Sequence, residues 1–197
     1  MSRVLVFDTE TTGLWKFKLP PDNPTQPEAV QIAAKLVNDV DGRILGQINF
    51  IIKAGSECEP QAAAIHGITN ELVEQAGVAR RVAIASFHNL LKAAEKTVAH
   101  NWDFDSKIIR RSYFLENSSS EIFDKMPGFC TMKSSTELCK LPGKFAGKYK
   151  WPSLQEAYKL LVDPAGFDGA HDAMVDVDAC LQVYLHLREM FDDRLSA

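Results

Sequence analysis

The chain has 197 residues, of which 46% are hydrophobic and 24% are charged, and these proportions are typical of a globular protein rather than a disordered one. Domains commonly contain about 100 to 200 residues, so we expect a single domain that spans residues 1–197. The net charge of −4 argues against a protein that coats nucleic acid nonspecifically, because such binding depends on many Lys and Arg contacts to phosphate. It does not exclude an enzyme that acts on nucleic acid, since clustered carboxylates make a site negative until cations bind.

No segment approaches the roughly 20 consecutive apolar residues that a membrane helix needs. The first residues also lack the layout of a signal peptide, because acidic residues interrupt them. We therefore expect a cytoplasmic protein that does not contact a membrane. The four cysteines lack the paired spacing of a zinc site, and the cytoplasm would keep them reduced, so we expect neither zinc nor disulfides.

The first half of the chain predicts three strands and one long loop. Residues 4–7 form an apolar run that delivers Asp8 and Glu10 at its C-terminal end, as a buried strand would. Residues 19–27 contain four prolines and predict a surface loop beside the site. Residues 30–37 and 44–52 are rich in β-branched and aliphatic side chains, and they predict two antiparallel strands joined by a two-residue turn at Asp41-Gly42.

The second half predicts helices around one further strand. Apolar residues at helical spacing indicate helices over 84–94, 104–115 and 173–187, and a short helix over 153–161. Residues 97–100 predict a strand, and 117–120 a loop. This order indicates an α/β domain with a mixed sheet flanked by helices, which should bind ligands at the C-terminal ends of its strands.

Five pairs of acidic residues are separated by one residue, whereas chance predicts about three, so such a pair alone is weak evidence. They are Asp8/Glu10, Asp39/Asp41, Glu57/Glu59, Asp103/Asp105 and Asp176/Asp178. Only the first directly follows a fully apolar strand. Residues two apart in a strand project to the same face, and two carboxylates placed so can hold the pair of ions that suits phosphodiester cleavage.

Three motifs occur in order: DTETTGL at residues 8–14, HNWDFD at 100–105 and HDAMVD at 171–176. Together they resemble the DEDDh exonuclease family, which includes the epsilon-type proofreading subunits of bacterial replicative polymerases. The segment AIHGIT at 64–69 is similar to a fourth family segment. The resemblance extends from Asp8 to the final helix, and it implies a ribonuclease-H-like fold with a central mixed sheet of five strands.

The resemblance also implies a role for each motif residue. Asp8, Glu10, Asp105 and Asp176 would bind two Mg²⁺ or Mn²⁺ ions, and His171 would be the general base for the attacking water. The residues expected to contact the terminal nucleotides are Thr11, Thr12, Gly13, Leu14, His66 and Asn101.

Other residues in or near the motifs are expected to have structural roles instead of catalytic ones. Trp102 and Asp103 depart from the usual pattern, and we expect Asp103 to cap a helix while Asp105 binds the ion. Asp172 and Asp178 are expected to be a cap or solvated acids. We interpret His88, His100 and His186 as structural, and Arg110-Arg111 as part of a solvated helix face.

The segment 144–151 mixes lysines with aromatic residues. Such a mixture suits a groove that holds the phosphates of a single strand and stacks its bases. A solvated loop explains it equally well, because Pro142, Gly143 and Gly147 make it a loop in either case.

The motifs predict a 3′-5′ exonuclease that prefers single-stranded DNA and releases nucleoside 5′-monophosphates, with a DNA polymerase or a repair protein as the expected partner. An exoribonuclease or oligoribonuclease that trims RNA 3′ ends is an alternative within the same class, because no motif encodes a contact to a 2′-hydroxyl. A noncatalytic nucleic-acid-binding module is the alternative from another class, and the complete set of four acids and His171 argues against it.

Overall fold

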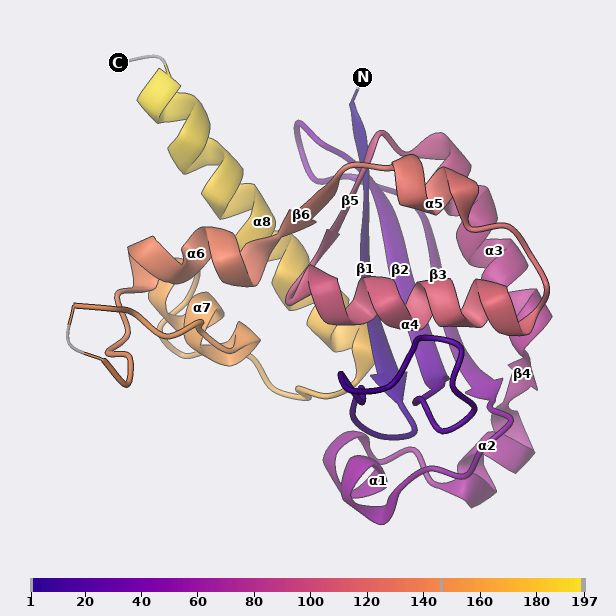
Figure 1. The fold of residues 1–197 in the computed structure, drawn as a ribbon. Coiled ribbons are helices and arrows are strands. Elements are labelled where there is room, and N and C mark those ends of the chain that lie inside the picture. Colours follow the sequence, from indigo (N-terminus) through magenta and orange to yellow (C-terminus); the bar gives the residue numbers. More distant parts are fainter. Residues whose placement is uncertain (1, 146, 196–197) are drawn as a thin grey trace.

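The computed structural model describes residues 2–145 and 147–195 and contains a sheet surrounded by helices (Figure 1). The strands are β1 (Arg3–Thr11), β2 (Ala29–Asn38), β3 (Ile44–Lys53), β4 (Val78–Ala79), β5 (Lys96–Ala99) and β6 (Gly128–Cys130). The helices are α1 (Pro60–His66), α2 (Asn70–Ala76), α3 (Arg80–Ala93), α4 (Trp102–Leu115), α5 (Glu121–Lys125), α6 (Thr131–Cys139), α7 (Leu154–Leu161) and α8 (Ala173–Leu195). None of the described helices is long and apolar enough to cross a membrane.

The sheet is mixed, as predicted, but it has six strands where five were expected, in the order β4-β3-β2-β1-β5-β6. Strand β2 is antiparallel to both of its neighbours, β1 and β3, whereas β4 runs parallel to β3, β5 parallel to β1 and β6 parallel to β5. The two edge strands have only two and three residues. Segments so short contain no hydrophobic period, so the sequence did not indicate them.

The apolar run of β1 is buried between two layers of helices. Leu5 and Phe7 pack toward α3, α4 and α5, and the ring of Phe7 lies 5.6 Å from that of Phe87 and 5.9 Å from that of Phe123. Val4 and Val6 pack on the opposite face, against α8. Figure 1 shows α4 crossing one face of the sheet and α8 lying behind the other. Because β1 lies in the middle of the sheet, residues at its C-terminal end can be reached from α4 on one face and from α8 on the other.

The hairpin between β2 and β3 is antiparallel as predicted, but its turn is longer than the two residues expected. Residues 39–43 separate the strands, and the N–H of Asn38 donates to the carbonyl of Arg43 at 2.9 Å. Gly42 lies within this turn with a φ of 69°, which glycine adopts without strain. The Asp-Gly pair thus predicted the position of the turn correctly, but the predicted length of two residues was wrong.

The proline-rich loop is ordered around one buried amide. Gln26 is buried, and its Nε2 group lies within hydrogen-bond distance of the carbonyls of Lys16, Leu19 and Pro20. The N–H of Lys16 donates to Gln26 Oε1 at 3.0 Å. A loop with so many prolines donates few backbone hydrogen bonds, and this side chain supplies bonds that the backbone cannot.

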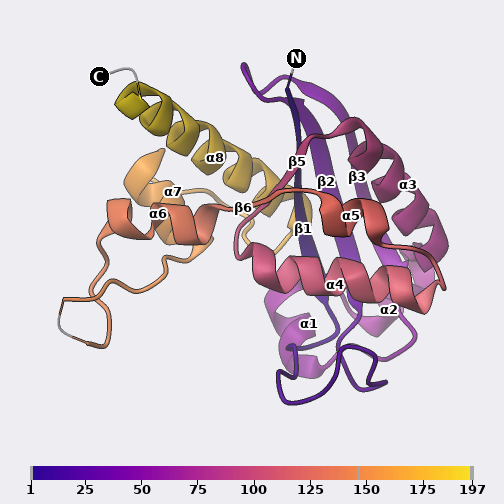
Figure 2. The ribbon, with the colours of Figure 1, turned by 45° about the horizontal axis from the view of Figure 1, so that its top comes forward.

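The predicted helices correspond to α3, α4, α7 and α8, whereas α1, α2, α5 and α6 were not predicted. Helices α6 and α7 pack beside α8, at a distance from α3 (Figures 1 and 2). Helix α1 and the loop after β1 lie at the end of the sheet where β1 terminates (Figure 1). That end therefore combines loops, short helices and the C-terminal ends of β1 and β5.

Candidate active site

Asp8 and Glu10 lie near the C-terminal end of β1, where they pair with Ala33 and Gln31 of β2. They continue the face of the strand that Val4 and Val6 occupy, because side chains alternate along a strand. That face packs against α8. The two carboxylates therefore point toward the layer from which the third motif arrives.

Asp105 reaches the same place from the opposite layer. Strand β5 runs parallel to β1, and α4 begins just after it, so the C-terminal ends of both strands lie at one edge. Asp105 is only 3% exposed, and its Oδ1 accepts hydrogen bonds from the N–H of Thr9 at 3.1 Å and from the hydroxyl of Thr9 at 2.7 Å. Thr9 lies between Asp8 and Glu10, so β1 itself orients the third acid.

Asp176 belongs to the first turn of α8, whose N-terminus is fixed to the sheet. The N–H of Ala173 donates to Gln31 Oε1 at 3.2 Å, and Gln31 is the strand partner of Glu10. Asp172 Oδ1 accepts the N–H of Met174 at 2.9 Å, so of the two roles expected for Asp172, a cap or a solvated acid, the structure shows the cap. These bonds place Asp176 beside Glu10.

His171 completes the group from the residues just before α8. Its ring, the carboxylate of Glu10 and that of Asp176 each offer a ligand atom, and these atoms lie within 4.8 Å of one another. The backbone N–H of His171 donates to Asp176 Oδ2 at 3.1 Å. His171 has a φ of 71° and an exposed side chain. The ring thus lies at the rim of the acidic cluster rather than beneath it.

Burial and mutual repulsion raise the pKa values of these acids. The pKa of Glu10 rises to about 8, first through burial and then through the charges of Asp176, Asp105 and Asp172. The pKa of Asp105 rises to about 7 through burial, against the hydrogen bonds from Thr9 that lower it. Burial and the neighbouring carboxylates hold the pKa of Asp8 well above its usual range. Carboxylates packed so closely are stabilised by cations.

The donor set fits divalent cations. Asp176 Oδ1 is buried and has no hydrogen-bond partner among the described residues, although buried carboxylate oxygens normally have one. The four acids offer hard oxygen ligands, which Mg²⁺ and Mn²⁺ prefer. Asp8, Glu10, Asp105 and Asp176 could therefore hold metal ions, and Glu10 and Asp176 lie within reach of a common ion.

A cavity of about 480 Å³ adjoins the acids. Its lining comes from the end of β1, the loop after it, α1 and α4: Thr9, Glu10, Thr11, Gly13, Leu14, Glu59, Gln61, Ala62, Ile65, His66 and Phe104. Leu14 and Ile65 are 80% and 59% exposed and give the cavity an apolar rim. The cavity thus offers apolar surface next to a carboxylate cluster.

Four of the predicted substrate-binding residues line this cavity, and two do not. Thr12 is buried, and its backbone N–H and hydroxyl oxygen bond to the backbone of Glu28, so it fastens the loop to β2. Asn101 precedes α4 with a φ of 66°. The placement of these two residues favours roles in shaping the backbone.

His66 supports the cavity through the backbone. Its Nε2 lies 3.2 Å from the carbonyl of Thr11 and must donate there, because a carbonyl only accepts. Its Nδ1 accepts the N–H of Ile68 at 3.1 Å. Burial lowers the pKa of His66, in keeping with this neutral, doubly bonded ring. His66 thus joins α1 to the end of β1.

Two predictions about charged residues were wrong. Asp103 does not cap α4: it lies in the first turn, is exposed, and pairs with Lys133, while Asn101 is the residue at the cap position. Arg111 is not on a solvated face. It is buried, and its Nη1 donates to the carbonyl of Pro21 at 2.9 Å, which ties the proline-rich loop to α4.

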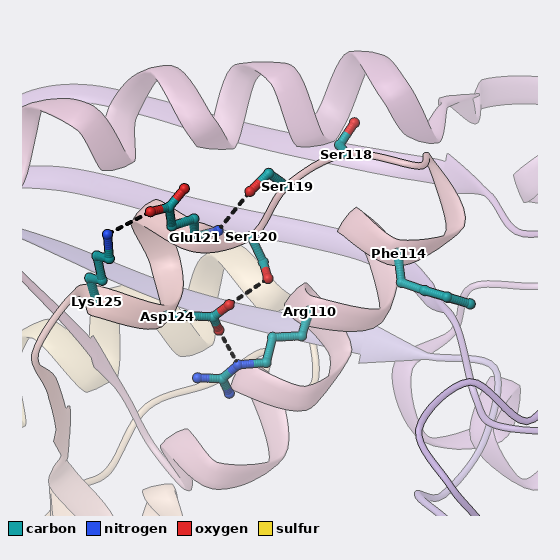
Figure 3. A pocket seen from close by; sticks show the side chains of 8 residues that line it. All are labelled: Arg110, Phe114, Ser118, Ser119, Ser120, Glu121, Asp124 and Lys125. Carbon is teal, nitrogen blue, oxygen red and sulfur yellow. Dashed lines mark hydrogen bonds and ion pairs between the residues drawn. The ribbon is translucent and has the colours of Figure 1, made fainter.

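A second cavity, of about 470 Å³, lies between α4 and α5, and its charged side chains bind one another (Figure 3). Arg110 Nε donates to Asp124 at 2.6 Å, and the hydroxyl of Ser120 donates to the same carboxylate at 2.6 Å. Lys125 pairs with Glu121 at 2.5 Å. This cavity contains no cluster of like charges, so the acidic cluster at the end of β1 remains the candidate active site.

Residues 5–184 match a protein-family model described as Exonuclease. The chain belongs to this exonuclease family. The recognition of the three motifs is thereby confirmed, and the protein is a nuclease with a ribonuclease-H-like fold. Enzymes of this family depend on metal ions, which agrees with the donor set at the end of β1.

The exonuclease is 31% identical over 183 residues to the uncharacterized exonuclease CP81 of Escherichia phage 186, covering 87% of this chain and 81% of that one. It is 29% identical over 184 residues to the DNA polymerase III subunit epsilon of Buchnera aphidicola, covering 93% of this chain and 71% of that one. Its fold is similar to that of E. coli exonuclease I crystallised with a dT13 oligonucleotide, with a TM-score of 0.78 and 20% identity. That match covers 98% of this chain but 43% of exonuclease I, so the chain spans less than half of that protein.

Proposed function

We propose that this exonuclease removes nucleotides from the 3′ end of single-stranded DNA and releases nucleoside 5′-monophosphates, using two Mg²⁺ or Mn²⁺ ions. The observation that carries the proposal is the convergence of Asp8, Glu10, Asp105 and Asp176 at one end of the sheet, with a buried Asp176 oxygen that has no partner in the described part of the chain. Two bound ions would lower the pKa of water and neutralise the charge that develops on the phosphate.

The residues of the chain have separate tasks in this reaction. The four acids provide ligands, and Thr9 holds Asp105 in place. His171 takes the proton of the attacking water, because its side chain is exposed beside Glu10 and Asp176, where water can reach it. The bond from water oxygen to phosphorus forms while the bond from phosphorus to O3′ breaks, and the released O3′ takes a proton from solvent. The phosphate therefore stays on the 5′ position of the released nucleotide.

The cavity supports a single-stranded end as the substrate. Its apolar rim of Leu14 and Ile65 suits a base that has left its stack, and unpairing such a base from a duplex costs energy. E. coli exonuclease I, which shares the fold, was crystallised with a dT13 oligonucleotide and in a complex with single-stranded DNA. Thr11 and Gly13 line the same cavity, and their backbone would contact the terminal sugar.

Three further expectations rest on the sequence and the family alone. They are that the chain works as a single domain, that it acts in the cytoplasm, and that a DNA polymerase or a repair protein is its partner. The relative from Buchnera aphidicola is a polymerase subunit, which supports the last of these.

Digestion of matched strands tests the proposal. DNA and RNA of the same sequence, labelled at either end, are incubated with and without Mg²⁺ or Mn²⁺, and with the Asp8→Asn variant as a control. We expect the 3′ label to be released first as a mononucleotide, from DNA, and only with metal. Faster release from RNA would identify an exoribonuclease. Release of the 5′ label first, or cleavage by Asp8→Asn, would overturn the proposal.

A further inference from the structure

Residues 140–145 and 147–151, which lie between α6 and α7, form a projecting loop that we call the lysine loop (Figures 1 and 2). Its two arms bridge at Pro142 and Tyr149, and the N–H of Gly143 donates to the carbonyl of Lys148 at 2.9 Å. A Cβ atom at Gly143 would lie 2.5 Å from that carbonyl oxygen, and Gly147 has a φ of 75°. The loop is therefore a built hairpin whose shape depends on two glycines.

The lysine loop is positive although the chain is negative. It contains Lys140, Lys144, Lys148 and Lys150 and no acidic residue, while acids outnumber Lys and Arg by 26 to 22 in the whole chain. Lys150 pairs with Glu156 at 2.6 Å. Lys144 and Lys148 are exposed and form no ion pair within the described residues. Their charges are thus available to an anion.

Large aromatic rings accompany these charges. Phe145 is 74% exposed, Trp151 is 62% exposed, and Tyr149 is also exposed. Exposed apolar side chains gathered in one place usually mark a surface that binds something. Proteins that bind single-stranded nucleic acid without sequence preference combine cations for the phosphates with rings that stack on bases.

The base of the lysine loop is connected to the active site. His100 is half-buried, and its Nε2 donates to the carbonyl of Pro152, next to Trp151, at 3.0 Å. The hydroxyl of Thr131, at the start of α6, lies 2.9 Å from His100 Nδ1. His100 directly follows β5 and precedes α4, which carries Asp105. One side chain therefore fastens the lysine loop to the junction that positions a metal-binding acid.

We propose that the lysine loop binds the part of a single strand that extends away from the active site. Lys144 and Lys148 contact phosphates, and Phe145 and Trp151 stack on bases. This inference rests on the proposed function and adds a second binding surface to it. The positive charge selects an anionic strand over an apolar protein partner, because rings alone would suit either.

Steady-state kinetics with two substrate lengths test the role of the lysine loop. One substrate is a trinucleotide, and the other is a strand of about 20 nucleotides, longer than the sites known for single-strand binding folds. For the Lys144→Gln/Lys148→Gln variant we expect a higher KM on the long strand and unchanged kinetics on the trinucleotide. The slope of log KM against log salt should fall by about 1.4, since each contact to a single-stranded phosphate contributes about 0.7. The value of kcat should stay the same on both.

Two further variants separate charge from stacking. Phe145→Ser should raise the KM of the long strand roughly fivefold or more, because one stacked base is lost, while the salt slope stays as in the wild type. Arg81→Gln/Lys92→Gln removes the same charge from exposed positions on α3, in the other helical layer. This control variant should have the same KM and kcat as the wild type on both substrates. Circular dichroism verifies that each variant is folded.

The outcomes distinguish this inference from the proposed function. If the wild type cleaves both substrates and the loop variants keep its KM on the long strand, the lysine loop does not bind the strand and the proposed function stands. An equal effect of the α3 control would also overturn the inference, since the effect would come from overall charge. If the wild type cleaves neither substrate, the proposed function fails. Fluorescence anisotropy of the labelled long strand then decides the binding role of the lysine loop by itself.

Discussion

The carboxylate of Asp105 accepts two hydrogen bonds from Thr9, a residue 96 positions earlier in the chain. Thr9 lies between Asp8 and Glu10 on β1, so one short segment supplies two acids and orients a third. The hydroxyl and the N–H of Thr9 also lower the pKa of Asp105, against the burial that raises it. We therefore predict that Thr9 is a positioning residue for the proposed metal-binding set.

Replacing Thr9 by Val removes the hydroxyl while keeping the shape of the side chain. Asp105 would lose its shorter hydrogen bond, and its charged form would be less favoured. We expect a 10- to 100-fold loss in apparent Mg²⁺ affinity or activity, which is typical when a partner of a metal ligand is removed. The cleavage rate measured as a function of Mg²⁺ concentration gives both the apparent affinity and the maximal activity. Thr9→Ser should restore most of the loss, and a Thr9→Val enzyme with normal Mg²⁺ dependence would show that Thr9 does not position Asp105.

Asp105→Asn should abolish turnover, whereas Asp103→Asn should not. The two acids belong to the same turn of α4, yet Asp105 is buried in the cluster and Asp103 is exposed beside Lys133. The pair therefore provides a matched control for the loss of one carboxylate. Asp8→Asn and Asp176→Asn should behave as Asp105→Asn does and still give a normal circular dichroism spectrum. Equal activity of the Asp103 and Asp105 variants would contradict the assignment.

The site residues that were predicted correctly could be recognised from the residues next to them in the sequence. Asp8 and Glu10 follow an apolar run that is typical of a buried strand, and Asp172 precedes apolar residues at helical spacing. Separating Asp105 from Asp103 depended on the family motif, in which the acid follows Phe104, and on the different directions of the two helical side chains. For each of these, the local pattern and the final structure agree.

The parts that were missed depend on tertiary structure. Helix α1 has seven residues and none of them is buried, so it has no core-facing stripe for a pattern to reveal. Its Ile65 faces the cavity, where an apolar residue serves the ligand instead of the core. Arg111 was misjudged for a similar reason, since only the folded proline-rich loop supplies the carbonyl that it binds.

Replacing His171 separates proton transfer from metal binding. Because His171 has a positive φ, Asn is the better replacement, since Asn tolerates this conformation and cannot act as a base. We expect His171→Asn to keep its metal affinity in calorimetry and to lose roughly 10² to 10⁴ in rate, the usual contribution of a positioned general base. The ring atom also lies close enough to Glu10 and Asp176 to bind an ion. A loss of metal affinity in proportion to the loss of rate would therefore identify His171 as a ligand.

Metal-free protein should become less stable as pH rises, because the folded state holds the acids of the cluster at raised pKa values. The pKa of Glu10 is about 8 and that of Asp105 about 7, against ordinary values of 4.5 and 3.8. Between the ordinary and raised values the folded state binds more protons than the unfolded state, so stability falls with rising pH across that window. Thermal unfolding in chelator should show a Tm that declines from about pH 5 to about pH 8, and Mg²⁺ should raise Tm most at the upper end. Glu10→Gln should flatten the decline, because an amide does not titrate. A Tm in chelator that is the same for Glu10→Gln and wild type at every pH would show that the cluster is not the source of the pH dependence.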